Sequence, residues 1–228
     1  MNKSNEPVVK IKFGTKQISY LLNRHPAMNR KLIENNDTLI FSNRAIRDIS
    51  TQIRSSTNSA KIQMGVFPVS GNITIYDGEM LVKDLLQAKL ITQNIEIEVY
   101  CGKEQIGKYY STSNWKLSEN SRVVEIEIKD ILSLFDTISS DQISIKRDIT
   151  GRTLLSLLQS QSNNVVYSNI GYNIEFEYED GVLEYLDKFY FKIAYIEGSN
   201  LATMWDTFCY ATLLIVYSNN GKIKIGRF

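Results

Sequence analysis

Residues 122–129 read RVVEIEIK, a stretch in which an aliphatic side chain stands at every second position and glutamate fills positions between. This alternation is typical of a β-strand with one face buried and the other exposed. Residues 94–100, NIEIEVY, and residues 172–179, YNIEFEYE, repeat it. Three such segments predict a fold built mainly from strands.

Two turn signals accompany these strands. Residues 213–218, LLIVYS, are separated from residues 222–228, KIKIGRF, by a turn that contains Asn220-Gly221, and this pair tolerates the positive φ values of a type I′ turn. Asp180-Gly181 follows the segment 172–179 and predicts a second hairpin.

Short helices are predicted between the strands. Apolar residues at helical spacing mark residues 42–55, 80–89, 129–137, 152–159 and 200–212, with Ser42 and Ser199 as the expected caps of the first and last segments. Their apolar stripes are typical of core packing rather than of a cofactor site. The expected fold class is α+β, mostly β.

The composition of the 228 residues, 43% hydrophobic and 22% charged, is that of an ordinary globular protein. Twenty-six basic and twenty-five acidic side chains leave a net charge of +1, which argues against nucleic acid as a partner. The longest apolar run, Ala211 to Tyr217, is far too short to span a bilayer, so no membrane insertion is expected.

The small net charge hides a strong asymmetry. Residues 1–61 hold eleven Lys and Arg against four acids, a net charge of +7, and the rest of the chain carries −6. Two interpretations stay open. Both surfaces are simply solvated, or unlike-charged surfaces of neighbouring subunits meet head to tail.

No residue pattern in the chain indicates catalysis. The motifs of serine hydrolases, zinc peptidases, dinucleotide-binding proteins and P-loop proteins are absent. His25 precedes Pro26 and is expected to be a turn residue, whereas Cys101 and Cys209 are expected to be free thiols. Asp77-Gly78-Glu79 lacks the spacing of a calcium loop and predicts a turn before a helix. We therefore expect no catalytic, cofactor-binding or metal-binding residues, and no cofactor.

Glutamates two residues apart occur on all three alternating segments, and paired carboxylates can act as acid and base. The pairs are Glu96 with Glu98, Glu125 with Glu127, and Glu175 with Glu177. Because each glutamate alternates with a core residue, all six are expected to face water rather than to share a site.

Residues 69–136 resemble a stretch of the tail or baseplate hub proteins of long-tailed bacteriophages and related contractile injection systems. The resemblance is carried, in order, by a strand at 73–76, IGKYY at 106–110, Trp115, VVEIEIK at 123–129 and DILSL at 130–134. Residues 151–161, GRTLLSLLQSQ, resemble the short helix after the first barrel of these proteins. Residues 198–228 resemble their unit of one helix followed by two strands.

The resemblance implies a non-enzymatic structural component of a tail tip or baseplate hub, built from small β-barrel domains with short helices. Such hubs form a ring that joins the tail tube to the tip or spike. We therefore expect a homo-oligomer, a trimer, that contacts other tail or baseplate proteins. It would be assembled in the host bacterial cytoplasm and reside in the virion tail.

Three segments are expected, although the first of them has no counterpart in the resemblance. Residues 1–60 would form a basic N-terminal segment, a strand plus a helix, that packs on the first barrel. Residues 61–140 would form the first β-barrel domain, and residues 141–228 a second α/β domain that ends in a hairpin. Trp115 is expected to plug one end of the first barrel.

An alternative function is a carbohydrate- or cell-surface-binding β-module of a tail protein. In that case Trp115 would be an exposed anchor for the ligand.

Overall fold

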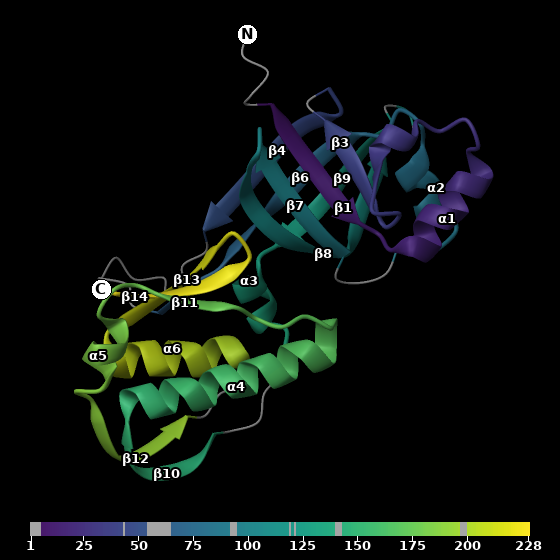
Figure 1. Cartoon of the computed structure of the whole chain (residues 1–228). Helices are drawn as coiled ribbons and strands as arrows, with labels where there is room; N and C mark the ends of the chain where they lie inside the picture. Colours follow the sequence, from purple (N-terminus) through teal and green to yellow (C-terminus); the bar gives the residue numbers. More distant parts are fainter. Residues whose placement is uncertain are drawn as a thin grey trace. The chain divides into compact units, whose positions relative to one another are not determined.

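The computed structural model describes residues 6–42, 44–53, 65–91, 95–118, 120, 122–139, 143–196 and 200–228. The chain divides into two compact units (Figure 1). Unit 1 comprises Met1–Gln52 and Ser70–Lys129, and unit 2 comprises Ile53–Val69 and Asp130–Phe228. Each unit thus combines two separate stretches of chain.

Unit 1 is built on one eight-stranded sheet. Its strands in spatial order are β2 (Ile33–Glu34), β3 (Thr38–Ser42), β1 (Pro7–Lys12), β7 (Ile95–Cys101), β8 (Glu104–Ser118), β9 (Val123–Lys129), β6 (Val69–Tyr76) and β4 (Ile46–Ile53). Among the described residues this sheet is open, with β2 and β4 at its edges. The expectation of a closed β-barrel is therefore corrected. Closure would need β2 and β4 to pair, and a two-residue edge strand offers few backbone groups for that.

Alternation along the strands places the core of unit 1 on one face of the sheet. Val124, Ile126 and Ile128 of β9 are fully buried, as the pattern of residues 122–129 predicts. They pair with β6, where Ile73 lies opposite Ile126 and Ile75 lies opposite Val124. The strand prediction is confirmed here, because the buried positions of β9 alternate along the strand and two of them lie opposite buried isoleucines of β6.

Two helices, α1 (Thr15–Arg24) and α2 (Leu81–Gln87), add side chains to this core and contact each other at one end of unit 1 (Figure 1). α2 confirms the helix predicted for residues 80–89. The buried residues that the two helices contribute are Ile18, Leu21, Leu81, Val82 and Leu85.

Residues 46–53 form the edge strand β4, so the helix predicted for residues 42–55 is wrong; positions 43, 54 and 55 lie outside the described residues. Isoleucines at helical spacing favoured a helix, but isoleucine is also a good strand former. The Tyr76 N–H donates to the Ala45 carbonyl at 2.6 Å and joins the start of β4 to β6. A Cβ atom at Gly71 would lie 1.9 Å from the Ser50 carbonyl oxygen. Glycine at this position thus permits the close approach of β4 to β6.

Unit 2 combines two sheets with four helices in the part of the chain that the structure describes. One sheet has the order β11 (Phe176–Tyr178), β14 (Lys222–Arg227), β13 (Leu214–Asn219) and β5 (Gly65–Phe67), and a second sheet pairs β10 (Ile143–Thr150) with β12 (Tyr190–Ile196). The helices are α3 (Ile131–Phe135), α4 (Gly151–Ile170), α5 (Val182–Leu186) and α6 (Leu201–Thr212).

β13 and β14 form the predicted terminal hairpin. They pair antiparallel, and Asn220 and Gly221 have φ angles of 49° and 82°, as a type I′ turn requires. The second predicted hairpin is wrong. Gly181, with a φ of 77°, is the N-cap of α5, and β11 pairs in parallel with β14. The segment VLEYL after Gly181 forms this helix instead of a returning strand.

Side-chain caps explain where three helices of unit 2 begin. The caps are Asp130 for α3, Thr150 for α4 and Asn200 for α6, and each accepts a hydrogen bond from the backbone N–H three residues later. These helices confirm the predictions for residues 129–137, 152–159 and 200–212, although α4 continues to Ile170. The expected cap Ser199 lies outside the described residues.

Trp205 of α6 lies at the centre of unit 2 and is fully buried. Its ring stacks on Phe176 at a centroid distance of 5.7 Å and meets Phe208 edge-on at 6.2 Å. Its Nε1–H donates to the Ser162 hydroxyl of α4 at 2.9 Å. This hydrogen bond joins α4 and α6 within the core of unit 2.

Candidate functional site

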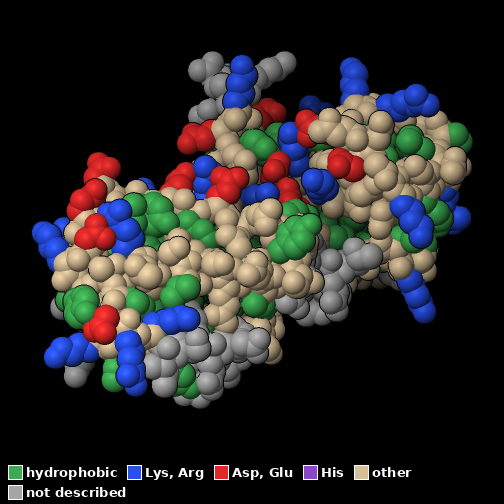
Figure 2. Space-filling view, turned by 60° about the horizontal axis from the view of Figure 1, so that its bottom comes forward, with side chains coloured by type: hydrophobic (Ala, Val, Ile, Leu, Met, Phe, Trp, Pro, Cys, Tyr) green, Lys and Arg blue, Asp and Glu red, His purple; other side chains and the backbone are tan. Residues whose placement is uncertain are grey.

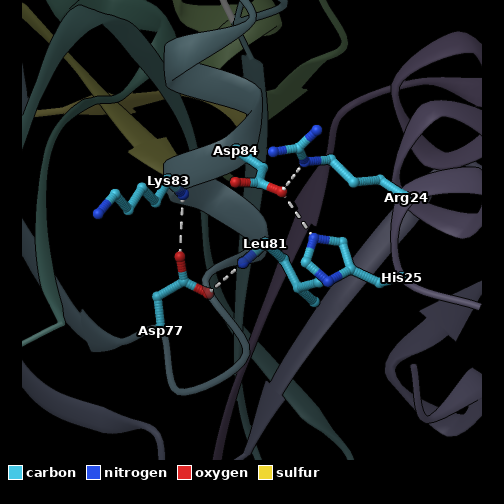
Figure 3. A network of polar contacts seen from close by, with 6 residues as sticks. All are labelled: Arg24, His25, Asp77, Leu81, Lys83 and Asp84. Atoms are coloured by element: carbon cyan, nitrogen blue, oxygen red, sulfur yellow. Dashed lines mark hydrogen bonds and ion pairs between the residues drawn. The ribbon is translucent and has the colours of Figure 1, made fainter. Parts of the chain in front are cut away.

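A polar network joins the two helices of unit 1 (Figure 3). Arg24, the last residue of α1, donates its Nε–H to Oδ2 of Asp84 in α2 at 2.6 Å. Nε2 of His25 lies 2.7 Å from the same oxygen. The Arg24 guanidinium and the His25 imidazole therefore contact the same carboxylate oxygen of Asp84. These contacts link the C-terminal end of α1 to α2.

The environment of Asp84 favours its ionised form. Burial raises the pKa of Asp84. The hydrogen bonds from His25 and Arg24 and the charge of Arg24 lower this pKa by more than burial raises it, so the pKa lies below the ordinary value. The side chain of Asp84 is 11% exposed, whereas that of Arg24 is 58% exposed. The interaction thus combines a nearly buried acid with a solvated base, an arrangement of modest strength.

Asp77 holds the start of α2 from the other side. Its carboxylate, 2% exposed, accepts from the backbone N–H groups of Leu81 at 2.8 Å and Lys83 at 3.0 Å. Burial raises the pKa of Asp77, and these backbone hydrogen bonds oppose the increase. Asp77-Gly78-Glu79 therefore forms the predicted turn into a helix, and its acid serves as a cap.

The hydrogen bonds of this network fix the positions of α1 and α2. The hydrogen bonds of His25 and Arg24 both go to Asp84. The carboxylate therefore orients the turn after α1, and no nucleophilic side chain takes part in this network. His25 follows the C-terminal end of α1 directly, as expected for a turn residue. The sequence alone did not reveal its partner, because His25 and Asp84 are 59 residues apart.

A second group of charged residues crosses the outer face of the sheet. In the strand registers, Lys10 and Lys12 of β1 lie opposite Glu98 and Glu96 of β7, and Lys108 of β8 lies opposite Glu98. We call these five residues the charge ladder. Lys108 Nζ lies 3.2 Å from a carboxylate oxygen of Glu96, so the contacts include diagonal pairs.

Neighbouring side chains complete this surface. Lys10 forms a 2.7 Å ion pair with Glu34 of β2 and lies 4.9 Å from the ring centroid of Tyr100. The Tyr100 hydroxyl donates to Glu98 at 2.8 Å. Burial and this hydrogen bond raise the pKa of Tyr100 to about 12.

The charge ladder changes two expectations from the sequence. Glu96 is only 6% exposed, so the prediction that all six paired glutamates face water is wrong for this residue. Lys10 and Lys12, from the basic first sixty residues, lie against acids of the following region. Part of the charge asymmetry is thus neutralised inside unit 1. Figure 2 likewise shows acidic and basic side chains next to one another on the face in view.

The thiol of Cys209 does not lie in an activating environment. Cys209 is fully buried in α6, and burial raises the pKa of its thiol. Cys101 is half-buried, and neither cysteine forms a disulfide bond. Within the described ranges no group of three or more acids, histidines and cysteines could hold a metal ion. No described helix is both long and apolar enough to cross a membrane.

Trp115 of β8 is 9% exposed and belongs to the core of unit 1. Its ring lies 5.6 Å from that of Phe13. The buried position predicted for Trp115 is confirmed, although the sheet around it is open. An exposed anchor for a sugar is therefore not available at this residue.

No family model matches the sequence, and no curated protein matches it either. Among solved structures, the mostly-β α+β fold is similar to a class of phage tail proteins. One is the 43 kDa tail protein of prophage MuSo2 from Shewanella oneidensis, with a TM-score of 0.51 and 14% identity over 97% of this chain and 54% of that protein. The chain thus spans about half the length of this tail protein.

Two further structures have lower scores. The prophage tail protein gp18 from Listeria monocytogenes EGD-e matches with a TM-score of 0.47 and 10% identity, covering 96% of this chain and 50% of that one. The lidless PdpA–VgrG complex matches with a TM-score of 0.48 and 13% identity, covering 98% and 35%. At the level of the fold, the similarity to the MuSo2 tail protein confirms the resemblance to tail proteins.

Proposed function

We propose that the chain is a non-enzymatic structural component of a phage tail tip or baseplate hub, where it forms a ring that joins the tail tube to the tip or spike. The observation that carries this proposal is the similarity of the fold to the MuSo2 tail protein, which extends over 97% of the chain. The charge ladder and the Arg24–His25–Asp84 network support it as well, since their charged groups are engaged in strand pairing and helix positioning.

A hub requires subunits that associate with each other and with neighbouring tail proteins. We therefore propose a homotrimer that resides in the virion tail after assembly in the host cytoplasm. Open sheet edges offer surfaces for such contacts, because an exposed edge strand pairs readily with another chain. Both edges of the sheet of unit 1 are open among its described strands.

Light scattering coupled to gel filtration tests the assembly. The protein at high concentration, alone and mixed with its tail-tube neighbour, should show the mass of a trimer or of a trimer-containing complex. Electron microscopy of the same fractions should show a ring with threefold symmetry. A strict monomer under both conditions would contradict the hub proposal.

A further inference from the structure

A groove opens at the corner of unit 1 where β3 ends, β4 begins and β6 runs into α2. Its volume is about 340 Å³, enough for one or two large side chains. Apolar groups form much of its wall, among them Leu32, Phe41, Ala45, Tyr76 and Leu81. A groove of this lining suits an apolar anchor residue.

The charged residues of the groove favour an acidic occupant. Arg44 and Arg47 line it and are exposed, and no described carboxylate forms an ion pair with either. The Arg47 guanidinium lies 5.3 Å from the ring centroid of Tyr76 and is therefore held beside the groove. Glu79 is an exposed acid of the lining, and the carboxylate of Asp77 is already engaged with the start of α2.

The same two arginines flank an open strand edge. Among the strands that the structure describes, β4 is the last of the sheet on this side, and all of its side chains are exposed or half-buried. Ile53 at its end is 72% exposed. Proteins usually shorten or charge such edges, because their free backbone N–H and C=O groups pair with any extended chain.

We propose that the groove and the β4 edge together bind an extended, acidic segment of another protein. One large apolar side chain of that segment enters the groove, its backbone pairs with β4, and its carboxylates lie against Arg44 and Arg47. This is strand addition with one specificity pocket. The inference goes beyond the proposed function and does not depend on it, because it concerns a surface of unit 1 in any assembly.

Among the strands that the structure describes, a second copy of this chain offers no such segment. Its acidic strands β7 and β9 are paired on both sides within the sheet. In β11, Glu177 pairs with Lys222 at 2.9 Å, and Glu179, the residue after β11, accepts from the Tyr217 hydroxyl at 2.9 Å. The acidic segment of the proposal therefore belongs to a different protein.

Fluorescence anisotropy with a labelled synthetic peptide tests the proposal. The probe is EIEFEIE, which alternates apolar and acidic residues, and its matched control is KIKFKIK. We expect the acidic peptide to bind the full chain and the basic peptide to bind at least tenfold more weakly. Added salt should weaken binding of the acidic peptide, because the arginines are exposed.

Two variants test the contribution of the arginines and that of the groove separately. Arg44→Glu with Arg47→Glu should weaken binding of the acidic peptide about tenfold or more, whereas the matched reversal Lys16→Glu, at an exposed position of α1 outside the groove, should leave it within twofold. Ala45→Phe, which fills the groove without changing charge, should weaken binding to a similar extent. Circular dichroism confirms that each variant is folded.

Three results would overturn the proposal. The first is equal binding of the two peptides, and the second is binding that the double reversal does not change. The third is self-association of the parent that the double reversal abolishes while the acidic peptide fails to bind, which would identify a second copy as the occupant.

Discussion

The two tryptophans of the chain lie in the cores of different units, and their surroundings differ in one respect. Trp205 of unit 2 is fully buried and donates its Nε1–H to Ser162, whose own hydroxyl donates to the Leu158 carbonyl at 2.8 Å. Trp115 of unit 1 is 9% exposed, and no described residue accepts a hydrogen bond from its Nε1–H.

The difference follows from what surrounds each indole. In unit 2 the ring lies beside helices, and a helical serine can offer its hydroxyl to a neighbour after satisfying a carbonyl of its own helix. In unit 1 the ring lies on a sheet whose backbone groups are used mainly in pairing with adjacent strands, with a shift in the register of β8 on β9 between Ser111 and Trp115. A helical core can therefore satisfy a buried donor with a single side chain, whereas a sheet core accommodates it at a cost.

Removal of the satisfied indole should have the largest effect. Trp205→Ala leaves a cavity and removes the hydrogen bond that the Ser162 hydroxyl accepts, so we expect the free energy of unfolding to fall by about 5 kcal/mol. Urea denaturation followed by circular dichroism measures it. A loss below about 2 kcal/mol would mean that Trp205 does not organise unit 2.

Removal of the unsatisfied indole should cost less. For Trp115→Ala we expect a loss of roughly 3–5 kcal/mol, towards the lower value, because no hydrogen bond is broken. Trp115→Phe is the matched control and should cost about 1 kcal/mol or less, since it keeps an aromatic ring and removes the unpaired donor. A Trp115→Ala variant within about 0.5 kcal/mol of the parent would instead indicate an exposed residue.

Asp130 is a buried acidic group, whereas the two indoles are buried hydrogen-bond donors. Asp130, 1% exposed in unit 2, has its pKa raised by burial from 3.8 to about 6. The carboxyl group of Asp130 therefore binds its proton more tightly in the folded protein than in the unfolded chain. Its contribution to the free energy of unfolding is lost as the pH rises through about 6.

Asp130→Asn removes this titration and keeps an oxygen that can cap α3. We expect the variant to exceed the parent by roughly 2–3 kcal/mol at pH 7.5 and to match it near pH 4. Paired denaturation curves from pH 4 to pH 8 measure the difference. A difference that does not change with pH would show that Asp130 is ionised throughout.

Ser162→Ala should turn the surroundings of Trp205 into those of Trp115. The indole N–H would lose its acceptor, and we expect a loss of about 1–2 kcal/mol. Ser168→Ala is the matched control, because Ser168 makes the same bond to a carbonyl four residues earlier but is exposed. Equal effects of the two substitutions would show that the bond to Trp205 contributes nothing.

The terminal hairpin of unit 2 should give the smallest effect. Gly221 has a φ of 82°, so Gly221→Val should destabilise by about 1 kcal/mol, whereas Gly221→Asn should cost less. Thermal unfolding of a Trp115→Phe background, in which Trp205 is the reporter for unit 2, measures both. An unchanged melting temperature for Gly221→Val would contradict the role of this turn.

The features that could be predicted from the sequence are local ones. Residues 122–129 alternate because β9 has one buried face, and Asn220-Gly221 has positive φ angles whatever surrounds the hairpin. The helix at Leu81–Gln87 likewise follows from its own apolar spacing and from the Asp77 cap. Such signals need no distant partner.

The features that could not be predicted depend on residues far apart. The isoleucines of β4 fit a helix and a strand equally well, and pairing with β6 decides between them. Glu96 is buried because Lys108 and Lys12 lie on adjacent strands, and His25 meets Asp84 only after two helices have packed. In each case a contact between distant residues overrides a local preference.

The pairing of Val9 with Val99 also means that β1 is synthesised well before its partner strand β7. At roughly 5–20 residues per second, a ribosome makes residue 99 on the order of 5–20 s after residue 9. During that interval the edge of β1 that will meet β7 has no partner, and Lys10 and Lys12 give it a charge that discourages pairing with another nascent chain. The glutamates of β7 then supply the matching charge, so the same lysines protect the strand before folding and select its neighbour afterwards.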